Sequence, residues 1–161
     1  MFLERPIAAG LSLADAVSAI REQGGLVGLP HPFDRWRNSV ASRMVPSERA
    51  ELAQLADYVE AFNCRVRDPL DDSLATAYAR EHGLPMVAVS DAHEAGQVAG
   101  AYTVVCGAAS DADSLRVALT RSQRRHYIRP TAIRGEPEPQ RAQPTMPSPV
   151  RRLLAIARRS Y

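Results

Sequence analysis

The chain has 161 residues, 45% of them apolar and 24% charged, with a formal net charge of +2. This length and composition are typical of one compact globular domain. No apolar run approaches the roughly 20 residues needed to cross a bilayer, and the N-terminus lacks the basic and apolar regions of a signal peptide. These features favour a cytoplasmic protein and argue against a membrane partner.

The two cysteines, Cys64 and Cys106, lie far apart in the sequence and outside any CxxC or Cys/His cluster. This spacing gives no support to a disulfide framework or a structural zinc site. Both side chains are therefore expected to be reduced, partly buried thiols.

The first predicted elements are a helix and a short buried strand. Ser12 is a typical N-cap, and apolar residues then recur at helical spacing until Gly24 and Gly25 end the pattern. The apolar run 26–29 follows directly and predicts a strand, whose C-terminal end leads into His31.

The same order of helix and strand recurs twice. Ser47 is predicted to cap a second helix, which is followed by a strand over 58–62 with Asn63 at its exit. The stretch 71–81 predicts a third helix, and an apolar strand over 86–89 comes after it.

A strand over 102–105 and a helix beginning near Ser110 or Asp111 complete the predicted core. Helices that alternate with short buried strands imply parallel βαβ units with right-handed connections. The predicted fold class is therefore α/β.

The C-terminal part of the chain has a different composition. Residues 129–149 are rich in proline and polar residues and predict a disordered linker, while 150–161 predict a short basic helix or tail. Half of the 20 basic residues fall from Arg121 onward, where the only acids are Glu136 and Glu138. This tail is the basic part of the chain.

Reactive side chains follow three of the predicted strands. Ligand sites in α/β folds gather at the C-terminal ends of parallel strands, so these side chains are expected to share a cavity. Imidazole and carboxylate together suit zinc, manganese or iron. The residues concerned are His31 after the first strand, Glu60 and Asn63 at the second, and Asp91 and His93 after the third.

Each of these residues also has a structural interpretation. A histidine before a proline, as at His31, is more often a turn or capping residue than a ligand, and Asp91 could cap the helix that follows. Their joint placement at successive strand ends favours a site. His82 and His126 are interpreted as structural or solvent-facing, because one ends a helix and the other lies among arginines.

Three segments resemble the later motifs of the PHP family of metal-dependent phosphoesterases, in the same order and at similar spacing. They are 24–34 (GGLVGLPHPFD), 58–63 (YVEAFN) and 89–93 (VSDAH). The resemblance covers about residues 1–128 and implies the later βα units of a distorted (β/α)7, TIM-like barrel. It also implies hydrolysis of phosphoesters with two or three divalent ions of zinc, manganese or iron.

The resemblance assigns roles residue by residue. It implies that His31, Asp91 and His93 are metal ligands, with Asp91 able to bridge ions in the complete site. Glu60 and Asn63 would hydrogen-bond to the metal ligands or face the substrate. The substrate implied is a phosphorylated small molecule or a nucleotide. Arg35 and Arg65, just beyond two strand ends, are weaker candidates for a phosphate contact. No residue is assigned as catalytic with certainty.

The HxH motif and the other early ligands of PHP proteins do not occur in this sequence. We therefore expect a truncated gene model, a fragment or half of a split gene, with an upstream polypeptide supplying the missing ligands and the chain alone inactive. A second hypothesis is a non-catalytic binding module whose arginine-rich tail contacts nucleic acid. A third is a degenerate product with no activity.

Overall fold

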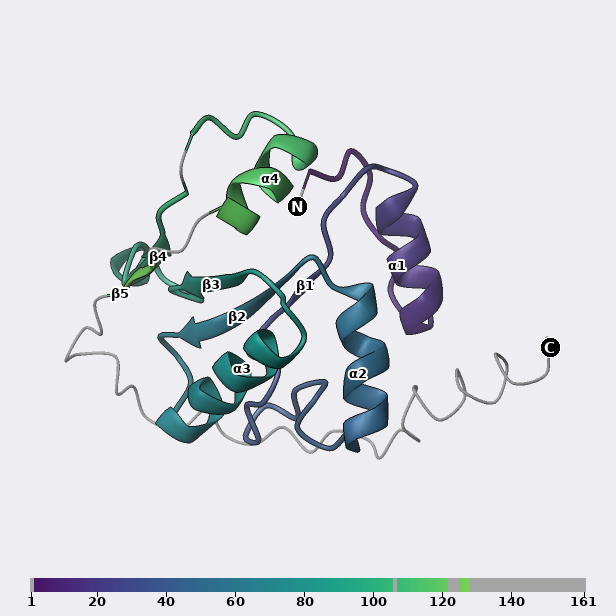
Figure 1. Ribbon diagram of the computed structural model, residues 1–161. Coiled ribbons are helices and arrows are strands. Elements are labelled where there is room, and N and C mark those ends of the chain that lie inside the picture. Colours follow the sequence, from purple (N-terminus) through teal and green to yellow (C-terminus); the bar gives the residue numbers. More distant parts are fainter. Residues whose placement is uncertain (1, 106, 122–124, 128–161) are drawn as a thin grey trace.

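A computed structural model describes residues 2–105, 107–121 and 125–127 (Figure 1). The predictions for Cys106, the linker at 129–149 and the tail at 150–161 lie outside the described residues. The elements in chain order are α1 (Leu13–Arg21), β1 (Gly28–Leu29), α2 (Pro46–Leu55), β2 (Tyr58–Asn63), α3 (Pro69–Glu81), β3 (Met86–Val89), the 3-10 helix η1 (Ala95–Gln97), β4 (Ala101–Thr103), α4 (Ala112–Arg121) and β5 (Arg125–Tyr127).

The central feature is a three-stranded parallel sheet in the order β1-β2-β3. The predicted α/β class and the first three strands are confirmed. Over the described residues this sheet is open and does not close into a barrel. The prediction of parallel strands throughout was wrong, because β4 pairs with β5 in a separate antiparallel sheet. The short β5 strand, Arg125–Tyr127, was not predicted at all, since it contains no run of apolar residues.

The helices begin where a side chain accepts a backbone N–H of the first turn, or where a proline removes the need for an acceptor. Ser12 caps α1 as predicted, and its hydroxyl accepts a 3.1 Å hydrogen bond from the Asp15 N–H. The predicted cap of α2 at Ser47 was wrong. That helix begins at Pro46, whose fixed φ suits the first helical position, and the Glu48 carboxylate accepts the Val45 N–H at 3.1 Å.

The third helix begins two residues earlier than its apolar pattern predicted. Asp68 caps it by accepting the Leu70 N–H at 2.9 Å, and Pro69 occupies the first position. His82 caps its C-terminus, where its ring lies edge-on to Tyr78 with centroids 4.7 Å apart. The structural interpretation of His82 therefore agrees with its position, whereas the His126 side chain lies outside the described residues.

The core has a layer on each face of the sheet. On one face, α2 and α3 pack against the central strand through Leu52, Val59 and Tyr78. On the other face, Val87 and the partly buried Tyr58 pack against Leu119 of α4. Figure 1 shows α3 and α4 on opposite sides of the strands. The neighbouring residues Tyr58 and Val59 of β2 thus point to opposite faces of the sheet, because side chains alternate between the two faces along a strand.

Glycine at position 28 is required by a close approach within the sheet. Gly28 pairs directly with Tyr58, and a Cβ at this position would lie 2.2 Å from the tyrosine ring. We expect Gly28→Ala to lower the free energy of unfolding by about 1–3 kcal/mol, because the ring must shift out of its packing. Urea denaturation would measure the loss.

The matched control is Gly96→Ala, since a Cβ at Gly96 meets no atom within 4 Å. That variant is expected to change the free energy of unfolding by no more than about 0.5 kcal/mol. Equal effects of the two substitutions would contradict the packing argument.

Among the helices of the described residues, none is both long and apolar enough to cross a membrane.

Candidate functional site

The three parallel strands bring their C-terminal ends to one edge of the sheet. Leu29 is in register with Val59, and Asn63 with Val89. The residues that follow β1 therefore lie beside the second half of β2, and those that follow β3 lie beyond its end. The arrowheads of β2 and β3 point the same way in Figure 1. His31 and Asp91 each follow their strand by two residues.

Asn63 joins the strand ends. Its side chain is fully buried, with 0% exposure. The amide Nδ2 donates to Glu60 Oε2 at 3.0 Å and to Asp91 Oδ2 at 3.2 Å, and the Oδ1 atom accepts the Arg65 N–H at 2.9 Å. A buried amide with both of its ends satisfied holds its neighbours in fixed positions.

A β-bulge places Glu60 and Asn63 on the same face of the sheet. Residues three apart in a regular strand point to opposite faces. In β2, however, Glu60 pairs with Val87 while Phe62 pairs with Ala88, so Ala61 is the extra residue of a bulge. The additional residue turns the Asn63 side chain to the face of Glu60, which permits their 3.0 Å contact.

His31 lies at the same edge. Its backbone N–H donates to Glu60 Oε2 at 2.9 Å, and its ring Nδ1 lies 2.8 Å from the Ser39 hydroxyl. The Nδ1 atom is thus engaged, which leaves Nε2 as the ring nitrogen for any further ligand. The side chain is half-buried, and its charge acts on Asp91.

An arginine that was not predicted lies at the centre of these groups. Arg37 donates from Nε to Asp34 Oδ2 at 2.6 Å, forms an ion pair with Asp91, and approaches Asn63 Oδ1 at 3.5 Å. The Asp34 side chain is 2% exposed and also accepts the N–H groups of Trp36 and Arg37. The only sequence signal for this pair is the three-residue spacing of Asp34 and Arg37.

The ion pair changes the proton affinity of both partners. Burial alone would raise the pKa of Asp91, but the hydrogen bond and charge of Arg37, the Asn63 amide and the charge of His31 together lower it. Burial acts to lower the pKa of Arg37, and its bonds to Asp91 and Asp34 raise it overall. Both groups are therefore charged at neutral pH.

Two of the predicted ligands occupy the left-handed region of the backbone. His31 has a φ of +29° and Asp91 a φ of +51°. Non-glycine residues with positive φ are uncommon and tend to cluster at functional sites. Their occurrence two residues after β1 and β3, the strands on either side of β2, supports a functional role for this edge of the sheet.

His93 lies on the exposed side of the same edge. Its Nδ1 is 2.9 Å from the Asp91 carbonyl oxygen, which can only accept, so Nδ1 is the donor and Nε2 is the ring nitrogen left for a further partner. Its backbone N–H donates to Gln97 Oε1 at 2.9 Å, and Arg65 reaches the same oxygen at 3.5 Å. Gln97 therefore places His93 and Arg65 next to each other.

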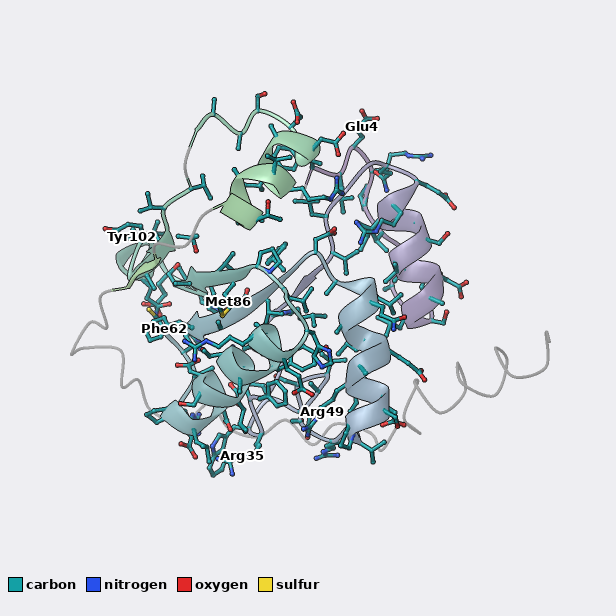
Figure 2. All side chains as sticks on the ribbon, viewed as in Figure 1. Glu4, Arg35, Arg49, Phe62, Met86 and Tyr102 are labelled. Atoms are coloured by element: carbon teal, nitrogen blue, oxygen red, sulfur yellow. The ribbon has the colours of Figure 1, made fainter. Side chains whose placement is uncertain are left out.

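Arg35 is separate from this group. Its Nε donates to Asp71 Oδ1 at 2.9 Å, and its Nη2 pairs with Asp68. Figure 2 shows Arg35 beside the N-terminal end of α3, whereas Phe62 is labelled near the end of β2. The structure thus brings together His31, Glu60, Asn63, Asp91 and Arg37, here called the strand-end group. His93 and Arg65 are linked to this group through the Asp91 carbonyl and the Arg65 backbone N–H. Arg35 instead forms ion pairs with Asp68 and Asp71.

The side chains of this site are of the types that bind divalent metals, but too few of them lie together to hold an ion. Metal-binding histidines commonly donate their other ring nitrogen to a carbonyl oxygen, as the ring of His93 does. Nevertheless, the part of the chain that the structure describes contains no group of three His, Cys, Asp or Glu side chains that could hold a metal ion. The described residues therefore do not form a complete metal centre by themselves.

Comparison with known proteins gives the family context. Residues 70–123 match the family model described as PHP-associated. This part of the chain is thus similar to PHP-associated domains. It contains Asp91 and His93, whereas His31, Glu60 and Asn63 precede the matched residues.

A relative extends the similarity. The chain is 37% identical over 102 residues to "Uncharacterized protein MJ0417" of Methanocaldococcus jannaschii. The match covers 63% of this chain and 43% of the relative, so the chain spans less than half of the relative's length. No solved structure matches the chain significantly.

Proposed function

We propose that this PHP-associated chain belongs to a metal-dependent phosphoesterase and supplies one side of its active site. The observation that carries the proposal is the buried Asn63 amide, which joins Glu60 at the end of β2 to Asp91 beyond β3. This amide lies at the carboxyl ends of parallel strands, where the ligand sites of α/β folds gather.

Each residue has a role in this proposal. His31, Asp91 and His93 would each supply one ligand to a divalent metal, through two imidazole Nε2 atoms and a carboxylate. In the described residues these three side chains do not form a group that could hold the ion by themselves. Glu60 orients His31 by accepting its backbone N–H. Arg65, adjacent to His93 through Gln97, faces the phosphate. Arg35 is a weaker candidate for this contact, because two carboxylates already bind its guanidinium.

A divalent metal bound there would supply an activated hydroxide and stabilise negative charge on the phosphoryl group. Zinc, manganese and iron all accept these ligand types. We further propose that the remaining ligands come from another polypeptide segment, because the described residues contain no group of three ligands. The substrate is a phosphorylated small molecule or a nucleotide.

Metal binding tests the assigned ligands. Manganese or zinc titrated into the purified chain is expected to bind at one weak site, measured by calorimetry. Asp91→Asn and His93→Ala are each expected to weaken that binding by at least about tenfold, since supporting residues alone change metal affinity by that factor.

His82→Ala is the control, because His82 caps α3 and lies outside the strand-end group. Its variant should bind metal like the unmodified chain. Metal affinity that is the same in all four proteins would rule out Asp91 and His93 as ligands. Hydrolysis of a generic phosphodiester is expected only when a segment that supplies the missing ligands is added.

A further inference from the structure

The only tryptophan of the chain lies exposed beside the strand-end group. Trp36 is 58% exposed, although an indole ring is among the side chains that gain most from burial. It belongs to the segment between β1 and α2, which also carries His31 and Arg37. A large aromatic surface thus faces solvent close to residues that are assigned to the site.

The position of Trp36 is fixed through its backbone. The Trp36 N–H donates to Asp34 Oδ1 at 2.9 Å, and the other oxygen of Asp34 accepts from Arg37 Nε at 2.6 Å. Arg37 in turn pairs with Asp91. The backbone of Trp36 is therefore joined to the strand-end group by a continuous chain of contacts, which limits the backbone ordering that stacking of a ligand requires.

The arginines that flank Trp36 in the sequence differ from Arg67, which lies over its ring, in how their charge is neutralised. Arg35 and Arg37 each pair with two carboxylates. Arg67 instead lies with its guanidinium 5.7 Å from the centre of the Trp36 ring, and Arg65 bonds to Gln97. Within residues 2–105, 107–121 and 125–127, neither Arg65 nor Arg67 forms an ion pair with a carboxylate. Arg67 is thus an unneutralised cation next to an exposed aromatic face.

We propose that Trp36 and Arg67 bind a nucleoside phosphate, with its base stacked on the indole and its phosphate paired with the arginine. The inference rests on the proposed function and assigns its substrate class. At an exposed site a cation–π contact stabilises less than base stacking does, so a base can displace Arg67 from the ring. The released guanidinium then forms charge-assisted hydrogen bonds with phosphate. A free mononucleotide and the end of an oligonucleotide share this chemistry.

Tryptophan fluorescence reports directly on the proposed contact, because Trp36 is the only source of the signal. AMP titrated into the chain in the presence of EDTA is expected to quench the emission saturably. Ribose 5-phosphate, which lacks the base, should bind at least about tenfold more weakly, as expected from the loss of one stacking contact. Equal affinity for AMP and ribose 5-phosphate would overturn the proposal.

Variants separate the base contact from the phosphate contact. By calorimetry, Trp36→Ala should weaken AMP binding about tenfold, while Trp36→Phe retains most of it. Arg67→Ala should weaken binding of AMP but not of adenosine. The control is Arg43→Ala, an exposed arginine of the same segment that bonds to Asn38. Unchanged AMP affinity in Trp36→Ala, or equal losses in Arg67→Ala and Arg43→Ala, would contradict the inference.

A 5′-phosphorylated oligoadenylate identifies the source of the nucleotide. Binding tighter than that of AMP supports an oligonucleotide end, and equal binding supports a free mononucleotide. Because these titrations contain no metal, their outcome is independent of hydrolysis. Nucleotide binding without metal binding at Asp91 would contradict the proposed phosphoesterase alone, whereas metal binding without base preference would contradict this inference alone.

Discussion

Replacing Arg37 with alanine is expected to lower the free energy of unfolding by about 3 kcal/mol, because it leaves a buried carboxylate without its cation. Asp34 is 2% exposed and would lose its 2.6 Å bond, while Asp91 would keep only the Asn63 amide. Arg37→Lys should recover part of the loss, since it keeps the charge but not the fork that joins two carboxylates. The midpoint of urea denaturation measures both effects.

The effect of Arg37→Ala should depend on pH with a defined sign. The pKa of Asp91 is lowered in the folded chain, so its ion pair adds stability above the unfolded value of about 3.9, and this stability is lost as the pH falls through the folded pKa. The difference between the variant and the unmodified chain is therefore expected to be larger at pH 7 than below pH 3.9.

The exposed Arg43 gives the matched control for this prediction. Its guanidinium bonds to the Asn38 side chain, and Arg43→Ala is expected to change the free energy of unfolding by no more than about 0.5 kcal/mol. If Arg37→Ala and Arg43→Ala cost the same, Arg37 does not hold the strand ends together.

Asp57→Ala should have the second large effect. The Asp57 side chain is 9% exposed and lies just before β2. It pairs with Arg21 of α1 at 2.6 Å and Arg116 of α4 at 3.3 Å, and accepts the Val27 N–H at 2.7 Å. Removing it leaves two arginines and one N–H without this acceptor. We expect a loss of about 3 kcal/mol, which would lower Tm by roughly 10 °C.

Asp113→Ala is the control for this substitution. Asp113 also pairs with Arg116, but its side chain is 90% exposed. Exposed ion pairs contribute little, so Tm is expected to change by at most a few degrees. Comparable losses of Tm in the two variants, measured by thermal denaturation, would show that burial of Asp57 is not what makes its contacts important.

The sequence predicted the order of elements well because burial on both faces of a parallel strand leaves a clear apolar run. Met86–Val89 was predicted to the residue, and β2 differs only by including Asn63. The strands after β3 were less accurate. The predicted strand 102–105 is observed at Ala101–Thr103, since antiparallel pairing with β5 decides its limits and that partner has no apolar signal.

Most residues of the strand-end group were predicted from the sequence, but the contacts between them were not. His31, Glu60, Asn63 and Asp91 were identified from their places after strands, which follow from parallel topology. The contact between Glu60 and Asn63 could not be predicted, because a regular strand would separate them and the bulge at Ala61 has no sequence signature. Arg37 was missed for a related reason: no periodic pattern describes the segment between β1 and α2.

His31 and Asp91 both have positive φ values, so the side chains proposed as metal ligands occupy positions where the backbone conformation is strained. Glycine adopts this conformation without the steric cost that other residues meet, on the order of 1 kcal/mol. Glycine would remove this strain, but at position 91 it would also remove the ion pair with Arg37, and at position 31 the contact with Ser39. In a search for more stable variants that ignores function, the residue kept at each position would therefore show whether the side-chain contacts outweigh the backbone strain there.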